Sequence, residues 1–389
     1  MKKDCDVSVI LVNYNGKRYI DNLMRSLCQL KHSDFTYEVI FVDNASTDGS
    51  VQYLKEKQLE QVIDLTIVES EENLGFAGGN NLGVEYASGS YIVFLNNDTM
   101  PETDWLENLY HYINRSPDVV MANSKLVFFY DFIKLTFRTQ DKILLKHEIQ
   151  INGKEYKIEN KFCKNLLYEP DRLVCFGHSE ICVPLLDGET DYIILLETIS
   201  AGEGDRALAC EEEAGLVSNE TAQLSISCGD IAQERFTLIQ NAGSGINEDY
   251  DGFDIGFCEL DGEAYAKEYE ITNGCGASII MRRDDFTQCG MFDEKFFMYY
   301  EDTDLSFRMK KNGGKIMYCP DSVVRHIHTG SSTEWSPFFV YHIYRNKLLF
   351  LKKNFGGKVF WKYFWSQLKN GIKERNKSKI KGTLDSLGL

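Results

Sequence analysis

Four short apolar segments rich in β-branched residues recur along the first part of the chain, at 7–12, 37–42, 63–68 and 91–95. Apolar residues with helical spacing follow the first segment at 19–30. Continuous apolar runs of this length are typical of strands that are buried on both faces. Their alternation with helical segments predicts an α/β fold, in which a mostly parallel Rossmann-like sheet has helices on both faces.

Polar residues follow these predicted strands directly. Asn13 comes after the first strand and Asp43 after the second. Because ligands of parallel α/β sheets bind at the carboxyl ends of the strands, we expect Asp43 to accept hydrogen bonds from a ribose or a base edge. The alternative is that Asp43 and Ser46 only cap the helix that follows.

Two further motifs belong to the same region. The glycine-rich segment 73–81 is similar to a phosphate loop, but it fits neither GxGxxG nor GxxxxGK[ST], so it is a weak signal alone. Asn96, Asn97 and Asp98 end the fourth strand. Oxygen ligands of this kind, together with diphosphate oxygens, suit Mg²⁺ or Mn²⁺. An Asx-type turn before Pro101 is the alternative.

A second chemical cluster lies at 274–330. Glu301, Asp302 and Asp304 gather at the predicted start of a helix, beside several aromatic residues. The helix dipole favours acids there, so capping is one explanation. An aromatic wall would also raise the basicity of a carboxylate, as a general base requires. His326 and His328 would share one face of a strand, where one of them either completes the metal shell begun by Asp98 or is structural.

The middle and the end of the chain have different patterns. From 126 to 240, short alternating runs separated by turn residues predict an inserted all-β domain, of sandwich or jelly-roll type. The segment 341–389 predicts a basic helical tail that mixes aromatic residues with lysines. Such a helix either lies on an anionic membrane surface or packs on the body with a solvated lysine face. The remaining parts, 1–125 and 241–340, would form the two halves of the catalytic domain.

Composition excludes some classes of function. The formal net charge of −17 argues against a nucleic-acid-binding protein, which needs surplus lysine and arginine. Eleven cysteines without a CxxC pair, no apolar signal-peptide core and no run long enough to span a membrane indicate a cytoplasmic protein with reduced thiols.

Taken together, the motifs resemble the family 2 glycosyltransferases with the GT-A fold, specifically the rhamnosyl- and galactofuranosyltransferase-like branch. The resembling stretches lie within 7–125 and 240–350, and they include SVILVNYNG, VIFVDNASTDGS, ENLGFAGGNN, YIVFLNNDTMP, GCGASIIMRRDDF and FDEKFFMYYEDTDLSFRMKKNG. None of these motifs is decisive alone, but jointly they are specific.

The resemblance implies roles for individual residues. Asp302 matches the catalytic base, and Asp98 and His326 match the metal ligands. Asn96 stands where the family's DxD motif usually has its first Asp, which makes Asp98 the main acidic ligand. The expected nucleotide-sugar contacts are Asn13, Asp43, Asn73, Gly75, Asn80, Asn96 and Asn97, and the expected acceptor-side residues are Tyr300, Glu301 and Asp304.

The implied reaction is the inverting transfer of a sugar from a nucleotide diphosphate to a saccharide or lipid-linked saccharide acceptor, in cell-surface polysaccharide synthesis. We expect it in the cytoplasm, with possible peripheral contact at the inner face of the plasma membrane. One alternative is a sugar-phosphate nucleotidyltransferase, but only Lys17 and Arg18 resemble the basic loop that such an enzyme needs. The other is a non-catalytic carbohydrate-binding protein, against which Asp98, Asp302 and His326 argue.

Overall fold

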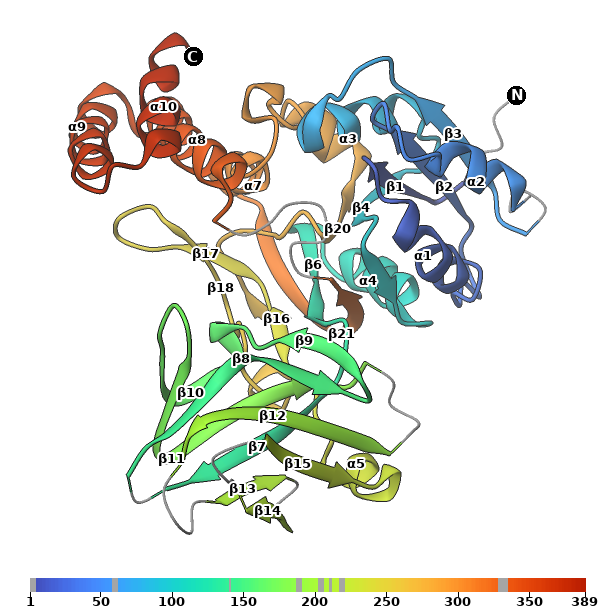
Figure 1. The fold of residues 1–389 in the computed structure, drawn as a ribbon. Coiled ribbons are helices and arrows are strands. Elements are labelled where there is room, and N and C mark those ends of the chain that lie inside the picture. Colours follow the sequence, from blue (N-terminus) through green and yellow to red (C-terminus); the bar gives the residue numbers. More distant parts are fainter. Residues whose placement is uncertain are drawn as a thin grey trace. The chain divides into compact units, whose positions relative to one another are not determined.

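The computed structural model describes residues 5–57, 62–139, 141–186, 191–201, 206–209, 212–216, 221–327 and 335–389. The chain forms two compact units (Figure 1). The first comprises 1–129, 240–257 and 262–389, and the second comprises 130–239 and 258–261. His328 lies outside the described residues.

The first unit is built on a ten-stranded mixed sheet, with the order β19-β21-β6-β20-β4-β1-β2-β3 and with β16 beside β6 and β5 beside β21. Its strands are β1 (Val7–Asn13), β2 (Tyr37–Asp43), β3 (Leu65–Glu69), β4 (Tyr91–Asn96), β5 (Thr99–Pro101), β6 (Val119–Phe128), β16 (Ile239–Asn241), β19 (Tyr269–Glu270), β20 (Ser278–Arg282) and β21 (Lys315–His326). The four strands predicted from the apolar runs are β1 to β4, and they are parallel, as expected. The α/β class is confirmed.

Helices cover both faces of this sheet because the strand side chains alternate between them. Val9 and Leu11 of β1 pack in one core cluster with apolar residues of the first and fourth helices. Ile10 faces the third helix, where a Cβ on Gly83 would lie 2.4 Å from Ile10 Cγ2, so only glycine permits this approach. The helices are α1 (Ile20–Leu27), α2 (Ser50–Glu56), α3 (Gly75–Tyr86), α4 (Trp105–Asn114), α6 (Arg283–Gln288) and α7 (Glu301–Lys311).

The second unit is an antiparallel sheet of nine strands in the order β14-β13-β7-β11-β8-β12-β15, with β10 beside β11 and β9 beside β8. Alternation along β8 buries every second side chain, and all of these except His147 belong to one apolar cluster. The inserted β structure is as expected, but it forms one sheet and not the predicted sandwich or jelly roll. The prediction failed on this point because the alternation of buried and exposed residues does not reveal how many sheets share a core. The elements are β7 (Phe132–Arg138), β8 (Ile143–Ile151), β9 (Lys154–Lys157), β10 (Cys163–Tyr168), β11 (Leu173–Pro184), β12 (Tyr192–Ser200), β13 (Arg206–Ala209), β14 (Glu212–Leu216), β15 (Thr221–Ile226) and α5 (Cys228–Glu234).

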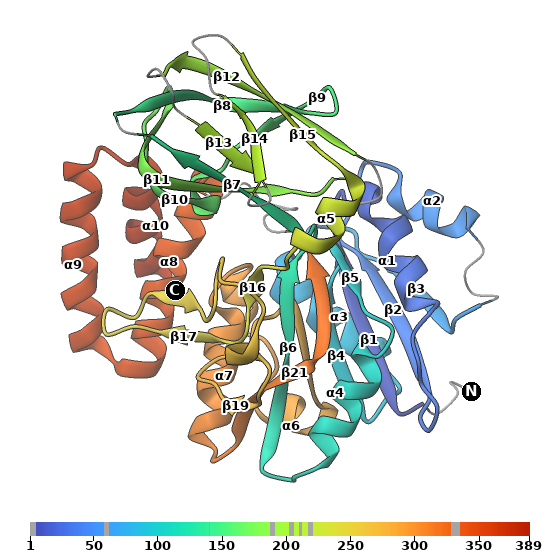
Figure 2. The same cartoon turned by 90° about the horizontal axis from the view of Figure 1, so that it is seen from below.

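Three helices, α8 (Pro337–Phe355), α9 (Gly357–Lys373) and α10 (Lys377–Asp385), close the first unit and pack side by side (Figures 1 and 2). Asn346 of α8 donates to the carbonyl oxygens of Phe296, Met298 and Tyr299, which fixes the turn before α7. Among the described residues, no helix is both long enough and apolar enough to cross a membrane.

Candidate active site

The carboxyl ends of β1 and β2 bring Asn13 and Asp43 together. The two residues are paired in register, and Asn13 Nδ2 donates to Asp43 Oδ1 at 3.0 Å. Asp43 Oδ1 also lies 3.4 Å from Ser50 Oγ, and Asp43 Oδ2 accepts the backbone N–H of Ser46 at 2.9 Å. A carboxylate has about four acceptor positions. The local capping role of Asp43 is therefore present, and its remaining acceptor capacity lies on Oδ2.

Asn97 extends this network to the end of β4. Its Nδ2 atom donates to Asn13 Oδ1 at 2.8 Å. The backbone of Gly16 lies against the side chains of Asn13 and Asn97. A Cβ at this position would lie 2.3 Å from Asn97 Nδ2, so a larger residue would not fit without a shift. Asn13, Asp43 and Asn97 thus form one buried polar cluster at the sheet edge, where the sequence predicts nucleotide binding.

The glycine-rich segment is not a phosphate cradle in this structure. The first amides of α3, those of Phe76 and Ala77, donate to the carbonyl oxygen of Phe297 at 2.7 and 3.2 Å. Gly75 has φ +71°, and a Cβ there would lie 2.4 Å from the same oxygen. Asn73 Oδ1 accepts the Gly75 N–H at 2.9 Å. The helix amides that a phosphate would need are therefore occupied, and the glycine serves a close backbone approach.

Asn80 also departs from its expected position near the base. It lies inside α3, is 1% exposed, and its Nδ2 atom donates to the Phe76 carbonyl oxygen at 2.9 Å. A side chain that bonds the carbonyl four residues earlier belongs to its own helix. We therefore correct its expected contact with the nucleotide to a structural role.

Asp98 and His326, far apart in the sequence, meet at hydrogen-bonding distance. β5 pairs with the end of β21, and the His326 Nε2 atom lies 3.1 Å from Asp98 Oδ1. Both side chains are largely buried. Asn96 Nδ2 lies 3.4 Å from the same Nε2 atom, so this amide borders the pair.

Gln240, which no sequence motif marks, contacts the imidazole ring of His326. Its Oε1 atom is hydrogen-bonded to His326 Nδ1, and its Nε2 atom lies 3.4 Å from the His326 carbonyl oxygen. An acceptor at Nδ1 places the ring proton there, so a neutral ring presents the lone pair of Nε2 to Asp98. Two acceptors that face each other require a cation between them or a proton on the ring. This donor set fits a divalent metal ion.

Asp302 is the second residue of α7 and is half-buried. Its Oδ2 atom accepts the Gly276 N–H at 3.0 Å, and its Oδ1 atom accepts the Thr303 N–H at 2.6 Å. Burial raises the pKa of Asp302 above its ordinary value, and the charge of Asp254 adds to this, although the two amides act in the opposite direction. A fixed carboxylate with a raised pKa has the properties of a general base.

A chain of hydrogen bonds connects the surroundings of Asp302 with those of His326. Cys275, next to Gly276, donates its N–H to Asn123 Oδ1 at 2.6 Å. Asn123 Nδ2 lies 3.3 Å from Asn241 Oδ1, and Asn241 Nδ2 donates to Asp254 Oδ1 at 2.6 Å. Asn241 and Gln240 are neighbours on β16. One short strand therefore contributes to both the Asp98–His326 pair and the Asp302 region.

The carboxyl group of Asp254 interacts electrostatically with both His326 and Asp302. Although Asp254 is largely exposed as a residue, neighbouring groups desolvate its carboxyl group and raise the pKa of Asp254, whereas its bonds to Ser244 and Asn241 and the charge of His326 lower it. Its own charge raises the pKa of Asp302. The sequence placed Asp254 in a segment that re-enters the fold but did not distinguish it from a loop residue.

The model for glycosyl transferase family 2 matches residues 8–171, and that for glycosyltransferase-like family 2 matches residues 261–341. The chain belongs to the family 2 glycosyltransferases. The two matches lie on either side of the residues that carry β16, and they include Asp98, Asp302 and His326.

Curated relatives of this glycosyltransferase match parts of the chain. An uncharacterized glycosyltransferase of Haemophilus influenzae is 26% identical over 46% of this chain and 47% of its own length. The putative teichuronic acid biosynthesis glycosyltransferase TuaG of Bacillus subtilis is 37% identical over 26% of this chain and 39% of its own. The chain thus spans less than half the length of these relatives. The crystal structure of GalNAc-T7 with UDP, GalNAc and Mn²⁺ shares the fold, with a TM-score of 0.51 and 12% identity over 89% of this chain and 48% of that one.

Two of the acceptor-side residues expected in this glycosyltransferase are structural. Asp304 is fully buried, and its carboxylate bonds Arg308 and Lys353 at 2.8 Å each and Asn354 at 3.0 Å. The hydroxyl of Tyr300 donates to the Tyr250 carbonyl oxygen at 2.9 Å, inside an apolar cluster with α8 and α9. We correct both to roles in anchoring α7, because neither offers a polar group to an acceptor.

Glu301 has a different environment from Asp304. It is buried, and its Oε2 atom has no hydrogen-bond partner among the described residues. Burial and the charge of Asp302 hold the pKa of Glu301 well above its usual range. The charged form of Glu301 is therefore disfavoured in this environment.

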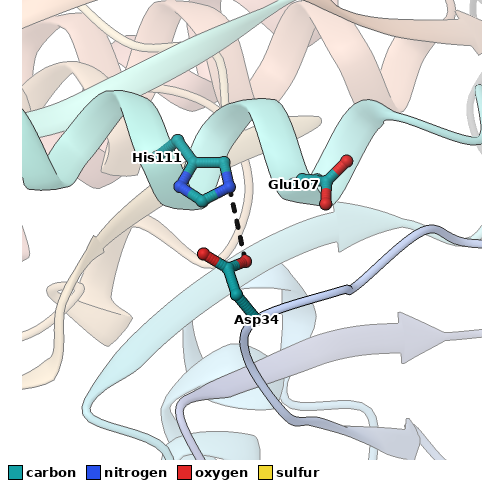
Figure 3. A group of neighbouring side chains, drawn as sticks. All are labelled: Asp34, Glu107 and His111. Atoms are coloured by element: carbon teal, nitrogen blue, oxygen red, sulfur yellow. Dashed lines mark ion pairs between the residues drawn. The ribbon is translucent and has the colours of Figure 1, made fainter.

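A separate group of side chains, Asp34, Glu107 and His111, lies on the surface (Figure 3). Their possible ligand atoms lie within 4.8 Å of one another, and His111 Nε2 is 3.4 Å from Asp34 Oδ1. Asp34 precedes the first residue of β2, whereas Asp43 is its last residue. This group therefore lies at the amino edge of the parallel strands, opposite the candidate active site.

Proposed function

We propose that the chain is an inverting, metal-assisted glycosyltransferase. It would move a sugar from a nucleotide diphosphate to a saccharide or lipid-linked saccharide acceptor in cell-surface polysaccharide synthesis. The observation that carries this proposal is the connection of two chemical groups through β16: an aspartate–histidine pair suited to a cation, and a half-buried aspartate with a raised pKa.

The residues of the chain divide the work of a single displacement. Asp98 and His326 would hold Mn²⁺ or Mg²⁺, which neutralises the charge that develops on the departing diphosphate. Asp302 accepts the proton of an acceptor hydroxyl. The acceptor oxygen then forms a bond to the anomeric carbon while the bond from that carbon to the diphosphate oxygen breaks. One displacement inverts the configuration, and no enzyme nucleophile is needed.

Asp43, Asn13 and Asn97 form the proposed nucleoside end of the site. The free acceptor capacity of Asp43 Oδ2 suits a hydroxyl or a base N–H. Asn96, whose Nδ2 atom lies near His326 Nε2, would contact the diphosphate of the donor. Asn73 and Gly75 would act indirectly, by holding the backbone turn at the start of α3.

His326 is relevant to two questions, namely which metal ion binds and which branch of the family the chain represents. Mg²⁺ takes oxygen ligands, whereas imidazole suits transition metals, so His326 favours Mn²⁺. A histidine at this position also favours the galactofuranosyl- and rhamnosyltransferase-like branch. We also propose a cytoplasmic site of action, which the eleven cysteines without a CxxC pair support.

The decisive experiment measures donor turnover by the purified full chain. Because GalNAc-T7 was crystallised with UDP and Mn²⁺, UDP-sugars with Mn²⁺ are tested first, followed by a dTDP-rhamnose arm. We expect release of the nucleoside diphosphate that stops with EDTA and returns with Mn²⁺. Release of pyrophosphate from a nucleoside triphosphate and a sugar phosphate would instead show a nucleotidyltransferase. Sugar binding without turnover of any donor would contradict the proposal.

A further inference from the structure

The α9 helix has one face that packs and one that does not. Phe360, Phe364, Gln367 and Gly371 recur at helical spacing and are buried in the contact with α8 and α10. Packing on this face is enough to hold the helix in place. Packing therefore does not constrain the residues on the exposed surface of the helix, and they can serve another function.

Large apolar side chains occupy part of the exposed surface of α9. Trp361, Trp365 and Ile372 are four and seven residues apart, so they lie on one side of the helix. They are 46%, 62% and 61% exposed, respectively, and the two tryptophan rings stack with their centroids 6.2 Å apart. A cluster of exposed large apolar groups on one helix face marks an interaction surface.

Lysines flank these apolar side chains on the same face. Lys358, Lys362, Lys369 and Lys373 are all exposed, and α9 contains no acidic residue. In the described part of the chain, none of the four forms an ion pair with an acid. Their charges are thus available to an external anionic partner, although the chain as a whole has a net charge of −17.

The combination of residues decides between partners. Tryptophan rings prefer the interface between lipid headgroups and acyl chains, and each lysine near an anionic membrane surface contributes about 1 kcal/mol of binding energy. A nucleic acid or an anionic glycan would use the lysines, but neither explains an exposed isoleucine in line with the tryptophans. An interfacial amphipathic helix requires all three residue types in this arrangement.

We propose that the outer face of α9, formed by Lys358, Trp361, Lys362, Trp365, Lys369, Ile372 and Lys373, docks the protein on an anionic lipid bilayer. The indole rings and Ile372 would enter the headgroup region, and the lysines would pair with lipid phosphates. This surface is independent of the chemistry at Asp98 and Asp302. It would bring a lipid-linked acceptor within reach of the enzyme.

Vesicle co-sedimentation of the full chain tests the proposal. One set of vesicles is phosphatidylcholine alone, and the other is phosphatidylcholine mixed with phosphatidylglycerol. We expect binding to the anionic vesicles that weakens steeply with salt, because the Debye length falls to about 3 Å at 1 M. Addition of these vesicles should also shift tryptophan emission to the blue, and the shift should disappear in W361F/W365F.

Paired variants separate the two contributions. Lys362→Gln with Lys369→Gln should weaken anionic-vesicle binding roughly 25-fold, whereas the matched pair Lys154→Gln and Lys157→Gln, two exposed lysines of β9, should leave it unchanged. Trp361→Ala with Trp365→Ala should weaken binding at every salt concentration. The control Trp335→Ala removes another exposed tryptophan outside α9.

The outcomes are distinguishable from those of the transfer assay. Equal binding to both kinds of vesicle would overturn the docking proposal. Unchanged binding in both the double-lysine and the double-tryptophan variant of α9 would also overturn it. So would retention on immobilised dextran sulfate without any vesicle binding, which would identify an anionic glycan as the partner. Thermal unfolding of each variant shows that it is folded, and turnover with a soluble acceptor reports separately on the active site.

Discussion

The Gln240→Leu substitution tests whether the Asp98–His326 pair is prepared for a metal ion. Gln240 is 2% exposed, so water does not replace its lost amide oxygen. A neutral His326 would then keep an unpaired Nδ1–H in a buried place, at a cost of about 1–3 kcal/mol. The ring can avoid this cost by moving its proton to Nε2, which lies 3.1 Å from Asp98 Oδ1. That tautomer bonds the two ligand atoms to each other and blocks the metal.

The expected effect is a loss of metal affinity without a loss of folding. Removing the partner of a ligating histidine usually weakens metal binding about 10- to 100-fold, which corresponds to about 1.4–2.8 kcal/mol. We expect this loss for Mn²⁺ in Gln240→Leu, measured by calorimetry or by the spin resonance of free Mn²⁺, without a donor. Gln240→Glu keeps an acceptor at Nδ1, so it should bind Mn²⁺ at least as well as the unaltered protein.

A matched control separates this effect from a general loss of a buried glutamine. Gln367 is also buried and donates to the Tyr344 carbonyl oxygen at 3.0 Å and to Thr383 Oγ1 at 2.7 Å, among the C-terminal helices. Gln367→Leu should lower the unfolding temperature but leave Mn²⁺ affinity unchanged. Normal Mn²⁺ binding by Gln240→Leu, together with lost binding by His326→Ala, would refute this role of Gln240.

Three further substitutions follow from the site. Asp302→Asn should abolish transfer while nucleotide-sugar affinity, measured by calorimetry, stays within a few-fold; in the unaltered enzyme, activity should fall as pH decreases through a pKa above the ordinary aspartate value. Asp304→Asn leaves Arg308 without its acidic partner and Lys353 with Asp293 alone, and should destabilise the fold by about 3–5 kcal/mol in urea unfolding. Gly75→Ala should lower the melting temperature, because φ +71° and the Phe297 carbonyl oxygen leave no space for a Cβ.

The meeting of Asn13 and Asp43 at the proposed nucleotide end was predictable because strand ends follow directly from the apolar runs. β1, β2 and β4 end within a residue of their predicted limits. Parallel pairing then puts Asn13 beside Asp43 without any knowledge of side-chain contacts. The Asp98–His326 contact could not be predicted from the strand ends alone. The residues alone favoured a structural histidine, and only the family resemblance related the two positions.

The glycine-rich segment shows why a local motif can mislead. Glycines that cradle a phosphate and glycines that admit a neighbouring carbonyl group have the same sequence. The difference here is Phe297, which occupies the amides of α3 from the other half of the fold. Asp304 is similar, since a sequence shows an acid at a helix start but does not show that Lys353 of α8 reaches it.

Gln240 and Asn241 carry no chemical signal in the sequence, yet they connect the two halves of the site. Successive residues of a strand point to opposite faces, so β16 presents one amide to His326 and the next to Asn123 and Asp254. Amides suit this position because they both donate and accept, and they add no charge between a proposed cation and a proposed base. A carboxylate at 241 would place a further negative charge next to Asp254 and raise the pKa of both acids. The neutrality of this strand therefore allows a metal ion and a proton acceptor to be held through neighbouring residues.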